Sequence, residues 1–404
     1  MKIVQVNISA NRGSTGKIAE GIGKLVLAEG WESYLAYGGS HRQSASQLIR
    51  IGTRRDIYCH AFESRLFDNH GLSSRQATRR FIDQIKEIKP DIIHLHNIHD
   101  YYLNYPILFE YINKTNTPVV WTLHDCWPFT GHCSHFDSIK CMKWKEGCHH
   151  CQGLNVYPKS WFSDRSERNY ALKKALFLEN VENMTLVPVS HWIEGFVRES
   201  FLKETNIKTI HNGIDLETFK VYDGRQMRKK YGMDNRFVIL GVAAPWTPTK
   251  GLADFIKLHA ILPKEEFAIM LVGLSEKQIG RLPEGVIGIS RTDSPQELAE
   301  IYSMADVFFN PTYEDNYPTT NLEAIACGTP ALVYDTGGCK EAVGEDVGFV
   351  VRQGDVAAAA GVIQGMTEKH LPKPVLKCRR YAEEHFDGDQ KFAEYIDIYK
   401  SYLK

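Results

Sequence analysis

The chain has 404 residues, of which 43% are hydrophobic and 24% are charged, and its formal net charge at pH 7 is −1. This composition is typical of a soluble globular protein, and the near-zero charge offers no basic field for nucleic-acid binding. A chain of this length exceeds what one hydrophobic core usually serves, so we expect two domains.

The N-terminal sequence MKIVQVNISANRG is too short and too alternating for a signal peptide. No apolar run approaches the roughly 20 residues that a membrane-spanning helix needs. We therefore expect a cytoplasmic protein, which could touch the cell membrane from its inner face. The basic stretch RSERNYALKKALFLE (165–179) could contact anionic lipid head groups there, although an ordinary solvated helix face explains the same charges.

Two series of short apolar segments alternate with amphipathic helices along the chain. The predicted strands are 2–8, 91–98, 119–125 and 185–190 in the first series, and 237–243, 267–273, 286–290, 306–311 and 330–335 in the second. This alternation predicts two doubly wound, Rossmann-like α/β domains with parallel sheets, and a ligand site in a central cleft between them.

We place the domain boundaries after residues 206 and 385. The N-terminal domain, 1–206, carries a cysteine-rich insert at 126–160. The C-terminal domain is 207–385, and the tail at 386–404 is predicted to be a helix that packs back on the N-terminal domain. The loop NRGSTGK (11–17) lacks the Gly-x4-Gly-Lys-Ser/Thr spacing of a P-loop, which excludes an ATPase of that type.

Histidines gather at the ends of two predicted strands of the first domain. VVWTLHD (119–125) ends with His124, whose ring Asp125 could orient. His94 and His96 share one face of the preceding strand, which favours packing or a mutual hydrogen bond, and His99 follows at the exit of that strand. A single histidine at a strand end is more often structural, so His124 is a candidate that needs further support.

The insert contains the sequence CSHFDSIKCMKWKEGCHHC, with Cys133, Cys141, Cys148 and Cys151. A Cys-x2-Cys pair with two further cysteines in a cytoplasmic chain favours a tetrahedral zinc site. Four thiolates leave no open position for a substrate, so this zinc would be structural. Disulfides and free buried thiols are the alternatives, and the reducing compartment argues against disulfides.

Two segments of the second domain place charged residues after strands. In GVAAPWTPTKGL (241–252), Lys250 and Gly251 open a helix, where a lysine can neutralise a diphosphate. In PTYEDNYPTTNLEAIACGTPAL (311–332), Asp315 follows a strand and Glu323 lies in an early turn of the next helix, which Thr319 or Thr320 is predicted to cap. The amides at that helix start suit a phosphate, and the second carboxylate suits a vicinal diol such as a ribose. An exposed lysine and an acidic loop are the structural alternatives.

These motifs resemble those of the family-4 retaining glycosyltransferases of the GT-B fold. That family has two acids separated by seven residues, followed by Ala-x-Ala-x-Gly-x-Pro; here Asp315 and Glu323 precede AIACGTP (324–330). Lys250-Gly251 and the linker IHNGID (210–215) match as well. The segment from WTLHDCWPFTGHC to NVYP is similar to the colanic-acid and capsular polysaccharide galactosyltransferase subgroup, which shares the cysteine pattern.

The resemblance implies roles for individual residues. Glu323 would hold the donor ribose, Asp315 and His124 would contact the donor sugar, and Lys250 would bind the diphosphate. The catalytic residues so implied are His124, Lys250 and Asp315. The other donor-binding positions so implied are Gly13 and Gly16 in the loop after the first strand, and Asn316, Tyr317, Thr319 and Thr320 in the loop and helix start.

Three departures from the family pattern stand out. The first acid is Asp315, one methylene shorter than the usual glutamate, with Glu314 beside it as an alternative. Pro318 replaces a loop glycine and has no N–H to donate. Ala244 stands where the family has an arginine, so Arg291 or Arg12 would have to supply that positive charge.

The resemblance therefore implies a hexosyltransferase that moves a sugar from a UDP- or GDP-sugar to a saccharide or lipid-linked saccharide in capsule or exopolysaccharide biosynthesis. No catalytic metal is expected, and a structural zinc is. A nucleotide-sugar 2-epimerase, a phosphorylase or a non-catalytic sugar-nucleotide-binding scaffold remain as alternatives. The expected partners are the nucleotide-sugar and the acceptor, with peripheral membrane contact and no nucleic acid.

Overall fold

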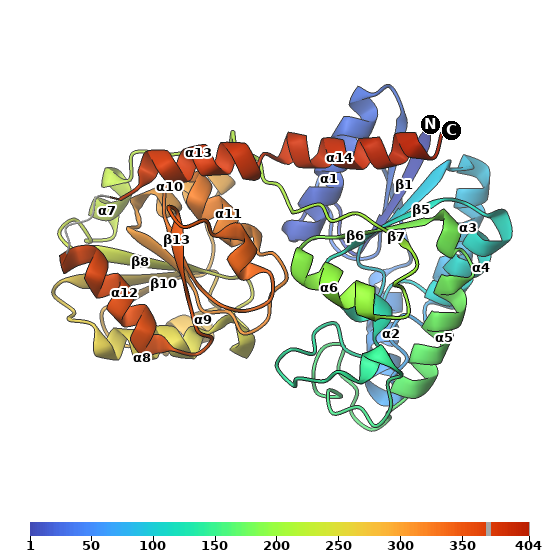
Figure 1. The fold of residues 1–404 in the computed structure, drawn as a ribbon, viewed down its shortest axis with the longest axis horizontal. Helices are drawn as coiled ribbons and strands as arrows, with labels where there is room; N and C mark the ends of the chain where they lie inside the picture. Colours follow the sequence, from blue (N-terminus) through green and yellow to red (C-terminus); the bar gives the residue numbers. More distant parts are fainter. Residues whose placement is uncertain (369–372, 404) are drawn as a thin grey trace. The chain divides into compact units, whose positions relative to one another are not determined.

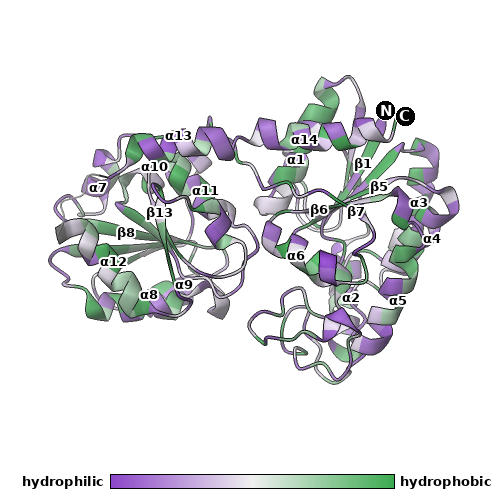
Figure 2. Ribbon diagram, in the orientation of Figure 1, coloured by the Kyte–Doolittle hydropathy of each residue, from purple (hydrophilic) through white to green (hydrophobic). Residues whose placement is uncertain are grey.

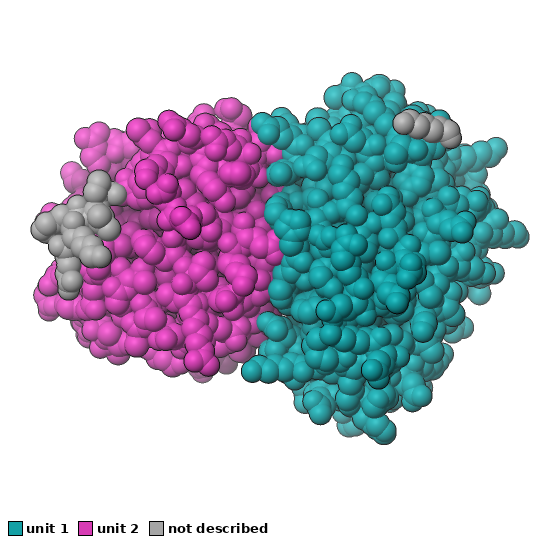
Figure 3. Space-filling model, viewed as in Figure 1, with its two compact units in different colours: residues 1–211, 389–404 teal, residues 212–388 magenta. Residues whose placement is uncertain are grey.

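The structure of the chain is a computed structural model that describes residues 1–368 and 373–403. Two compact units share the chain (Figure 3): unit 1 comprises Met1–His211 and Asp389–Lys404, and unit 2 comprises Asn212–Gly388. The unit borders therefore lie a few residues beyond the boundaries that we placed at 206 and 385.

Unit 1 contains a sheet of parallel strands in the order β3-β2-β1-β4-β5-β6-β7, with helices on its faces (Figure 1). Its strands are β1 (Lys2–Asn7), β2 (Glu32–Tyr37), β3 (Gln47–Arg50), β4 (Ile92–Leu95), β5 (Val119–Leu123), β6 (Met184–Pro188) and β7 (Asn206–Ile207). Its helices are α1 (Gly13–Ala28), α2 (Arg54–Phe67), α3 (Arg75–Ile88), α4 (Tyr105–Thr115), α5 (Ser166–Leu178), α6 (His191–Glu199) and α14 (Gly388–Ser401), with 3-10 turns η1 (Trp127–Phe129), η2 (Lys143–Lys145) and η3 (Val181–Asn183).

Unit 2 contains a second sheet of parallel strands, in the order β10-β9-β8-β11-β12-β13. Its strands are β8 (Phe237–Val242), β9 (Phe267–Val272), β10 (Val286–Ile289), β11 (Val307–Asn310), β12 (Ala331–Tyr334) and β13 (Gly348–Val351). Its helices are α7 (Arg225–Lys230), α8 (Leu252–Ile261), α9 (Glu276–Ile279), α10 (Pro295–Met304), α11 (Thr319–Ala326), α12 (Val356–Glu368) and α13 (Val375–His385), with 3-10 turns η4 (Pro248–Lys250) and η5 (Cys339–Ala342).

The predicted fold class, two doubly wound α/β sheets, is confirmed. The central strands are hydrophobic along their length, whereas the covering helices alternate hydrophobic and hydrophilic residues (Figure 2). This is the pattern that a parallel sheet buried on both faces requires. In both sheets the strand order reverses beside the first strand of the unit, which places ligand-binding loops at the carboxyl ends of β1 and β4 in one unit and of β8 and β11 in the other.

Four strands were absent from the sequence prediction: β2, β3, β7 and β13. Three of them, β3, β7 and β13, are short strands at the edges of the sheets. β3 and β13 are largely exposed, so they lack the continuous apolar run that marks a buried strand. β2 begins with exposed Glu32, and only its second half is continuously buried.

The C-terminal helix α14 belongs to the core of unit 1. Its residues Phe392, Tyr395 and Tyr399 are buried in one cluster with Ile18 and Ile22 of α1. A Cβ atom at Gly21 would lie 2.2 Å from the Phe392 ring, so only glycine allows this close packing of α14 on α1. The final residues of the chain thus complete the fold of the first unit.

Candidate active site

The loops after β8 and β11 are fastened together at the carboxyl end of the unit 2 sheet. The two strands are direct neighbours. The backbone N–H of Tyr313 donates to the carbonyl oxygen of Thr249 over 2.7 Å, and the Thr312 hydroxyl donates to the same oxygen over 3.3 Å. Because Lys250 follows Thr249 directly, these bonds bring its side chain to the loop that contains Asp315.

Lys250 and Asp315 form an ion pair. Lys250 Nζ lies 2.6 Å from Asp315 Oδ2, and the two side chains are 30% and 21% exposed. Burial acts to lower the pKa of Lys250, but the attraction and hydrogen bond of Asp315 outweigh it, so the pKa is raised above its usual value. Lys250 is therefore a fixed cation at neutral pH. A ligand with a stronger negative charge could replace Asp315 as its ion-pair partner.

Two glycines make this arrangement possible. Gly251 has φ +75°, and a Cβ atom there would lie 2.2 Å from the carbonyl oxygen of Pro311. Gly337 has φ +55°, and a Cβ atom there would lie 1.8 Å from the carbonyl oxygen of Asp315. Both positions combine left-handed backbone with a close approach of another loop, so both require glycine.

Helix α11 begins at Thr319, and its N-cap is Pro318, which makes no side-chain cap. The prediction that Thr319 or Thr320 caps this helix is therefore wrong, because both residues lie inside its first turn. An N-terminus without a side-chain cap can offer backbone N–H groups to an anion. Tyr317 is buried just before it, and its carbonyl oxygen accepts a hydrogen bond from Asn212 over 3.0 Å; Asn316 is buried as well.

Glu323 lies on the second turn of α11 and is 8% exposed. Its Oε2 accepts a hydrogen bond from the Tyr302 hydroxyl over 3.1 Å. Burial raises the pKa of Tyr302, and the charge of Glu323 raises it further, so the hydroxyl keeps its proton and donates. The amide of Asn310 at the end of β11 also bonds Asn321 of α11 over 2.8 Å, which fixes the helix that carries Glu323.

The structure places Arg291 apart from this group. Arg291 is exposed and follows β10, the edge strand, with β9 and β8 between it and β11. Arg12 and the glycines Gly13 and Gly16 belong to unit 1, at the start of α1. Gly16 allows close packing there, because a Cβ atom would lie 2.9 Å from Ser9 Oγ, whereas Gly13 has φ +70° and open space around it.

In unit 1, His124 belongs to a line of hydrogen-bonded side chains. Gln5 donates its amide to the Ala19 carbonyl, so its Oε1 accepts from His96 Nε2 over 3.1 Å. His96 Nδ1 must then accept from His124 Nε2, over 3.1 Å. Burial lowers the pKa of His124 to about 4, and that of His96 well below its usual value, so both rings are neutral at pH 7.

We suggested that Asp125 orients the His124 ring, but the structure shows other partners for this carboxylate. Asp125 pairs with His99, Oδ2 to Nε2 at 3.3 Å, and accepts the backbone N–H of Trp127 over 2.9 Å. His99 is buried and stacks on the Trp127 ring, so it is held inside the unit. The predicted sharing of one strand face by His94 and His96 is observed, and their rings stack at 4.2 Å.

The cysteine-rich segment folds around a small cavity. Cys133, Cys141, Cys148 and Cys151 all line it, and no disulfide joins any of the nine cysteines, all of which the structure describes. The sulfur atoms do not converge in threes: among the described residues, three donor atoms lie within 4.8 Å of one another only at Asp68, His70 and His132.

Lys173 of α5 was read from the sequence as part of a basic helix face, and the structure corrects this. Its side chain is fully buried and donates to the carbonyl oxygens of Trp127 and Thr130 over 2.7 and 2.9 Å. Burial lowers the pKa of Lys173, and the negative charges that oppose this most are those that Cys148 and Cys133 would carry as thiolates.

Sequence reasoning missed the residues that hold the candidates in place: Tyr302 behind Glu323, Gln5 and His96 behind His124, and Gly337 behind Asp315. Each acts through a long-range contact that no local motif marks. The one available signal was Gln5, a polar residue inside an otherwise apolar strand.

Two family models match the chain in succession. Residues 26–218 match "Glycosyltransferase Family 4", and residues 223–385 match "Glycosyl transferases group 1". The chain is 23% identical over 425 aligned positions to WcaC of Escherichia coli (strain K12), whose name proposes a glycosyl transferase of colanic acid biosynthesis; the match covers 99% of this chain and 100% of WcaC. It is also 29% identical to the alpha-galactosylglucosyldiacylglycerol synthase of Streptococcus pneumoniae (strain ATCC BAA-255 / R6), over 40% of this chain and 46% of the synthase.

Solved structures share the fold. Sucrose-phosphate synthase from Thermosynechococcus elongatus superposes with a TM-score of 0.74 at 17% identity, covering 100% of this chain and 99% of the synthase. Anabaena HepE in complex with UDP superposes with a TM-score of 0.70 at 16% identity, covering 99% of this chain and all of HepE. Among the described residues, no helix is both long and apolar enough to span a bilayer.

Proposed function

The chain is a glycosyltransferase of the GT-B fold, with a family 4 domain followed by a group 1 domain, and on this premise we propose that it transfers a hexose, with retention of anomeric configuration, from a UDP- or GDP-sugar to a saccharide or lipid-linked saccharide acceptor. The observation that carries the proposal is the grouping, at one end of the unit 2 sheet, of a fixed cation, an uncapped helix start and a buried carboxylate.

Each of the three features fits one part of a nucleotide-sugar. Lys250 and the first amides of α11 provide the positive charge and N–H donors that a diphosphate requires. The carboxylate of Glu323, which already accepts from the Tyr302 hydroxyl at Oε2, can accept hydrogen bonds from ribose hydroxyls. Once the diphosphate has replaced Asp315 as the partner of Lys250, Asp315 can accept hydrogen bonds from hydroxyls of the donor sugar. HepE, a structural neighbour, has been crystallised with UDP-glucose, which is consistent with this class of donor.

The reaction breaks the bond between the anomeric carbon and the diphosphate oxygen and forms a bond from that carbon to the acceptor hydroxyl. Negative charge grows on the departing diphosphate, so the fixed charge of Lys250 stabilises the transition state more than the ground state. The acceptor proton passes to the departing diphosphate oxygen on the same face, which preserves the configuration. His124, a neutral ring at pH 7, can contact a donor-sugar hydroxyl only through hydrogen bonding.

For the acceptor, we propose a saccharide intermediate of capsule or exopolysaccharide assembly, in keeping with the full-length similarity to WcaC. A lipid-linked acceptor would bring the enzyme to a membrane surface, and unit 1 has aromatic residues that suit such contact. Tyr58 and Phe62 of α2 are 74% and 56% exposed, and Phe162 is 80% exposed. The backbone N–H of Trp161 bonds the Arg65 carbonyl of α2, which brings the segment with Phe162 to that helix, and we propose that these residues form one patch.

Membrane contact can be tested by flotation with vesicles that contain or lack anionic lipid. Phe62→Ser with Phe162→Ser should reduce the bound fraction. Leu376→Ser, which removes a side chain 82% exposed in unit 2, is the matched control and should have no effect. Equal binding by all variants would refute the patch without affecting the proposed reaction.

The reaction itself is tested by incubating the protein with UDP- and GDP-hexoses and following release of the nucleotide, first alone and then with saccharide acceptors. An acceptor-dependent release with one preferred donor is expected, and NMR of the product should show the anomeric configuration of the donor. Glu323→Gln keeps a hydrogen-bond partner for Tyr302 but loses the charge, so kcat/KM for the donor should fall about 10- to 100-fold.

Glu345→Gln, an exposed carboxylate of unit 2, is the control and should retain full activity. Conversion of the donor without an acceptor would indicate an epimerase, and dependence on inorganic phosphate a phosphorylase. Donor binding without turnover under every condition would indicate a scaffold. Each of these results would overturn the proposed transferase reaction.

A further inference from the structure

The segment between β5 and α5, residues 124–165, contains only two short 3-10 turns, η1 and η2. Irregular segments of this length are uncommon inside compact domains and are usually functional or disordered. Yet its residues Trp127, Phe129 and Phe136 are fully or almost fully buried, and Trp144 is too. The segment is therefore ordered around a core of its own, and the cysteine cavity lies within that core.

We propose that this segment binds one Zn²⁺ through the thiolates of Cys133, Cys141, Cys148 and Cys151, with the ammonium group of Lys173 as a buried counter-charge. The ion would be structural, since four sulfur ligands complete its tetrahedral shell. On binding, each thiol releases its proton to the solvent. The proposal is independent of the sugar-transfer reaction.

Two backbone amides already point at the sulfur atoms. Gly131 N–H donates to Cys148 Sγ over 3.1 Å, and Gly153 N–H donates to Cys151 Sγ over 3.3 Å. The second bond runs from the residue two positions after the cysteine. Charged acceptors form stronger hydrogen bonds than neutral ones, so both bonds favour thiolates over thiols. A Cβ atom at Gly131 would lie 2.7 Å from Cys148 Cβ, which explains the glycine there.

Lys173 supplies the second line of argument. Its ammonium group is fully buried, its hydrogen-bond acceptors are two neutral carbonyl groups, and it lies 3.4 Å from the centre of the Trp127 ring. In the described part of the chain no carboxylate forms an ion pair with it. A buried charge without a counter-charge is costly. Zinc with four thiolates carries a net negative charge, and thiolates at Cys148 and Cys133 would act on Lys173 more strongly than the carboxylates of Asp125 and Asp68 do.

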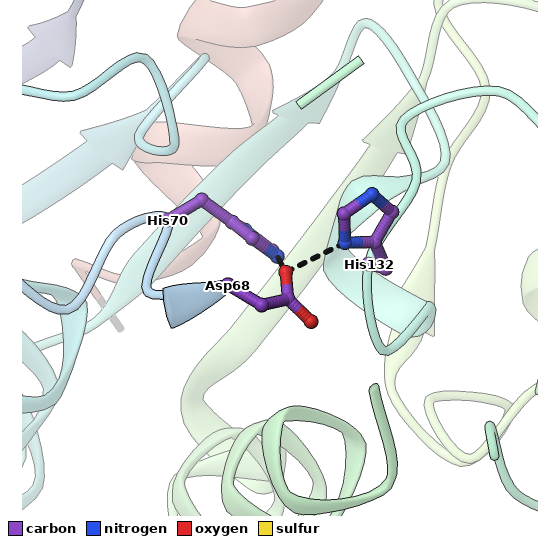
Figure 4. Close-up of side chains that lie close together, drawn as sticks. All are labelled: Asp68, His70 and His132. Atoms are coloured by element: carbon purple, nitrogen blue, oxygen red, sulfur yellow. Dashed lines mark hydrogen bonds and ion pairs between the residues drawn. The ribbon is translucent and has the colours of Figure 1, made fainter. Parts of the chain in front are cut away.

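The neighbouring group Asp68, His70 and His132 offers a competing metal site (Figure 4). Asp68 Oδ1 lies 2.6 Å from His132 Nδ1, a direct hydrogen bond that leaves no room for an ion between them. Asp68 Oδ2 accepts the backbone N–H of Arg165 over 2.9 Å, and His70 Nδ1 accepts from the Trp127 indole over 2.6 Å. These partners explain the group as a buried hydrogen-bond network.

His132 has a further consequence for the zinc site. Its other ring nitrogen, Nε2, points away from Asp68 in Figure 4, is buried and has no hydrogen-bond partner among the described residues, and His132 lines the cysteine cavity. It is thus a buried nitrogen donor that could replace a sulfur, and the exposed His149 also lines the cavity. We assign the four sulfurs because Cys141 lines the same cavity and because four thiolates give Lys173 the larger counter-charge.

The sulfur atoms must move closer to act as ligands of one ion, since no three of them lie within 4.8 Å of one another in the described chain. Cys141 and Cys151 lie in irregular backbone and are partly exposed, so side-chain rotation can bring them inward. The proposal therefore predicts a measurable tightening of this segment when zinc is bound.

The first test is the metal content of the purified full chain, with the thiols counted before and after treatment with a chelator. About one equivalent of zinc per chain is expected, with four more thiols reactive after its removal. Cobalt in place of zinc should give the visible bands of a tetrahedral ion and strong sulfur-to-cobalt charge transfer. Less than about a tenth of an equivalent with all thiols reactive, or a disulfide within the segment, would overturn the proposal.

Variants assign the ligands. Cys148→Ser and Cys141→Ser should each lose zinc, whereas Cys59→Ser, at an exposed cysteine of α2, should keep it. His132→Ala should also keep zinc; loss of zinc in His132→Ala with retention in Cys141→Ser would overturn the four-sulfur assignment. If the cysteine variants fail to fold, hydrogen exchange of residues 124–165 in the intact chain, with and without chelator, provides the same decision.

The counter-charge is tested by Lys173→Met against Lys174→Met, its exposed neighbour on α5. Zinc affinity, measured by competition with a chelator, should fall about 10- to 100-fold in Lys173→Met and remain unchanged in Lys174→Met. Equal affinity in both variants would overturn the role of Lys173.

Discussion

The two units contain sheets of the same type, but the polar side chains at their strand ends differ in charge. In unit 2, Lys250 and Asp315 are opposite charges in a partly exposed pair. In unit 1, His94, His96 and His124 are neutral rings: His96 is hydrogen-bonded to His124 and stacks on His94, which bonds Thr122. One sheet therefore carries fixed charge at its strand ends, which suits an anionic ligand, whereas the other carries uncharged rings, and both nitrogens of His94 and of His96 are bonded to other side chains of unit 1. Variants of each unit can test this difference.

The largest effect is expected at the fixed charge. Lys250→Ala removes the cation that faces the departing diphosphate, so kcat should fall about 100- to 1,000-fold, as for loss of one transition-state donor. The chain should stay folded, because the pair is partly exposed. Steady-state kinetics with the preferred donor measures the effect.

The matched control is Lys340→Ala, which removes the lysine of another, more exposed ion pair in unit 2, with Asp335 at 3.0 Å. This variant should keep its activity. If both lysine variants retained activity, Lys250 would be a surface residue, and the contrast between the units would lose its functional meaning.

Much of the active-site grouping in unit 2 could be predicted from the sequence, because it depends on short loops after predictable strands. Lys250, Asp315 and Glu323 are each identified by a local motif, and adjacent strands bring them to one edge. What the motif could not give is the support: Tyr302 reaches Glu323 from α10, and Gly337 packs on Asp315 from the loop after β12.

Unit 1 was less predictable for a physical reason. His124 is held by His96, which follows β4, and His96 is held in turn by Gln5 of β1. These residues meet only because β1, β4 and β5 pair in one particular register. The burial of Lys173 was also hidden, since its helix has charged residues on several sides and no clear apolar stripe. The four cysteines that the sequence groups in one segment line one cavity, and the zinc site that their spacing predicts stays a prediction.

Acid should affect the two units unequally. The pKa of His124 is about 4 in the folded chain and about 6.5 when unfolded, so the unfolded state binds more protons between these values. The contribution of His124 to the free energy of unfolding is fully present above about pH 6.5. It should fall by on the order of 3 kcal/mol as the pH is lowered towards about 4. The pKa of His94 is lowered to about 3 by burial and adds in the same direction.

Hydrogen exchange at pH 7 and pH 5, corrected for intrinsic rates, measures this difference locally. Protection of β4 and β5 should decrease more than that of β8 and β9, whose sequences contain no histidine. His124→Gln, neutral at every pH, should reduce the acid loss in unit 1. An equal loss of protection in both sheets would show that the neutral histidines are not its cause.

A smaller effect is expected from the glycine that supports Asp315. Gly337→Ala introduces a Cβ atom 1.8 Å from the Asp315 carbonyl oxygen at φ +55°, so the loop must shift. We expect a loss of about 1–3 kcal/mol in stability and about a tenfold weaker affinity for the donor, measured by calorimetry.

Gly232→Ala is the control for backbone strain alone, because Gly232 has φ +64° and no atom within 4 Å of an added Cβ. It should cost about 1 kcal/mol and leave the affinity for the donor unchanged. If both variants weakened donor binding equally, the effect would come from general instability and not from the position of Asp315.

The smallest effect is expected from Tyr313→Phe. The Tyr313 hydroxyl donates to buried Asp254 over 2.6 Å, but Tyr334 and Lys257 also bond this carboxylate, so its loss should cost only about 1 kcal/mol in thermal unfolding. Activity should change less than about threefold, because the backbone N–H of residue 313 still holds Thr249 and hence Lys250. A loss of activity as large as that of Lys250→Ala would mean that the side chain, and not the main chain, positions the cation.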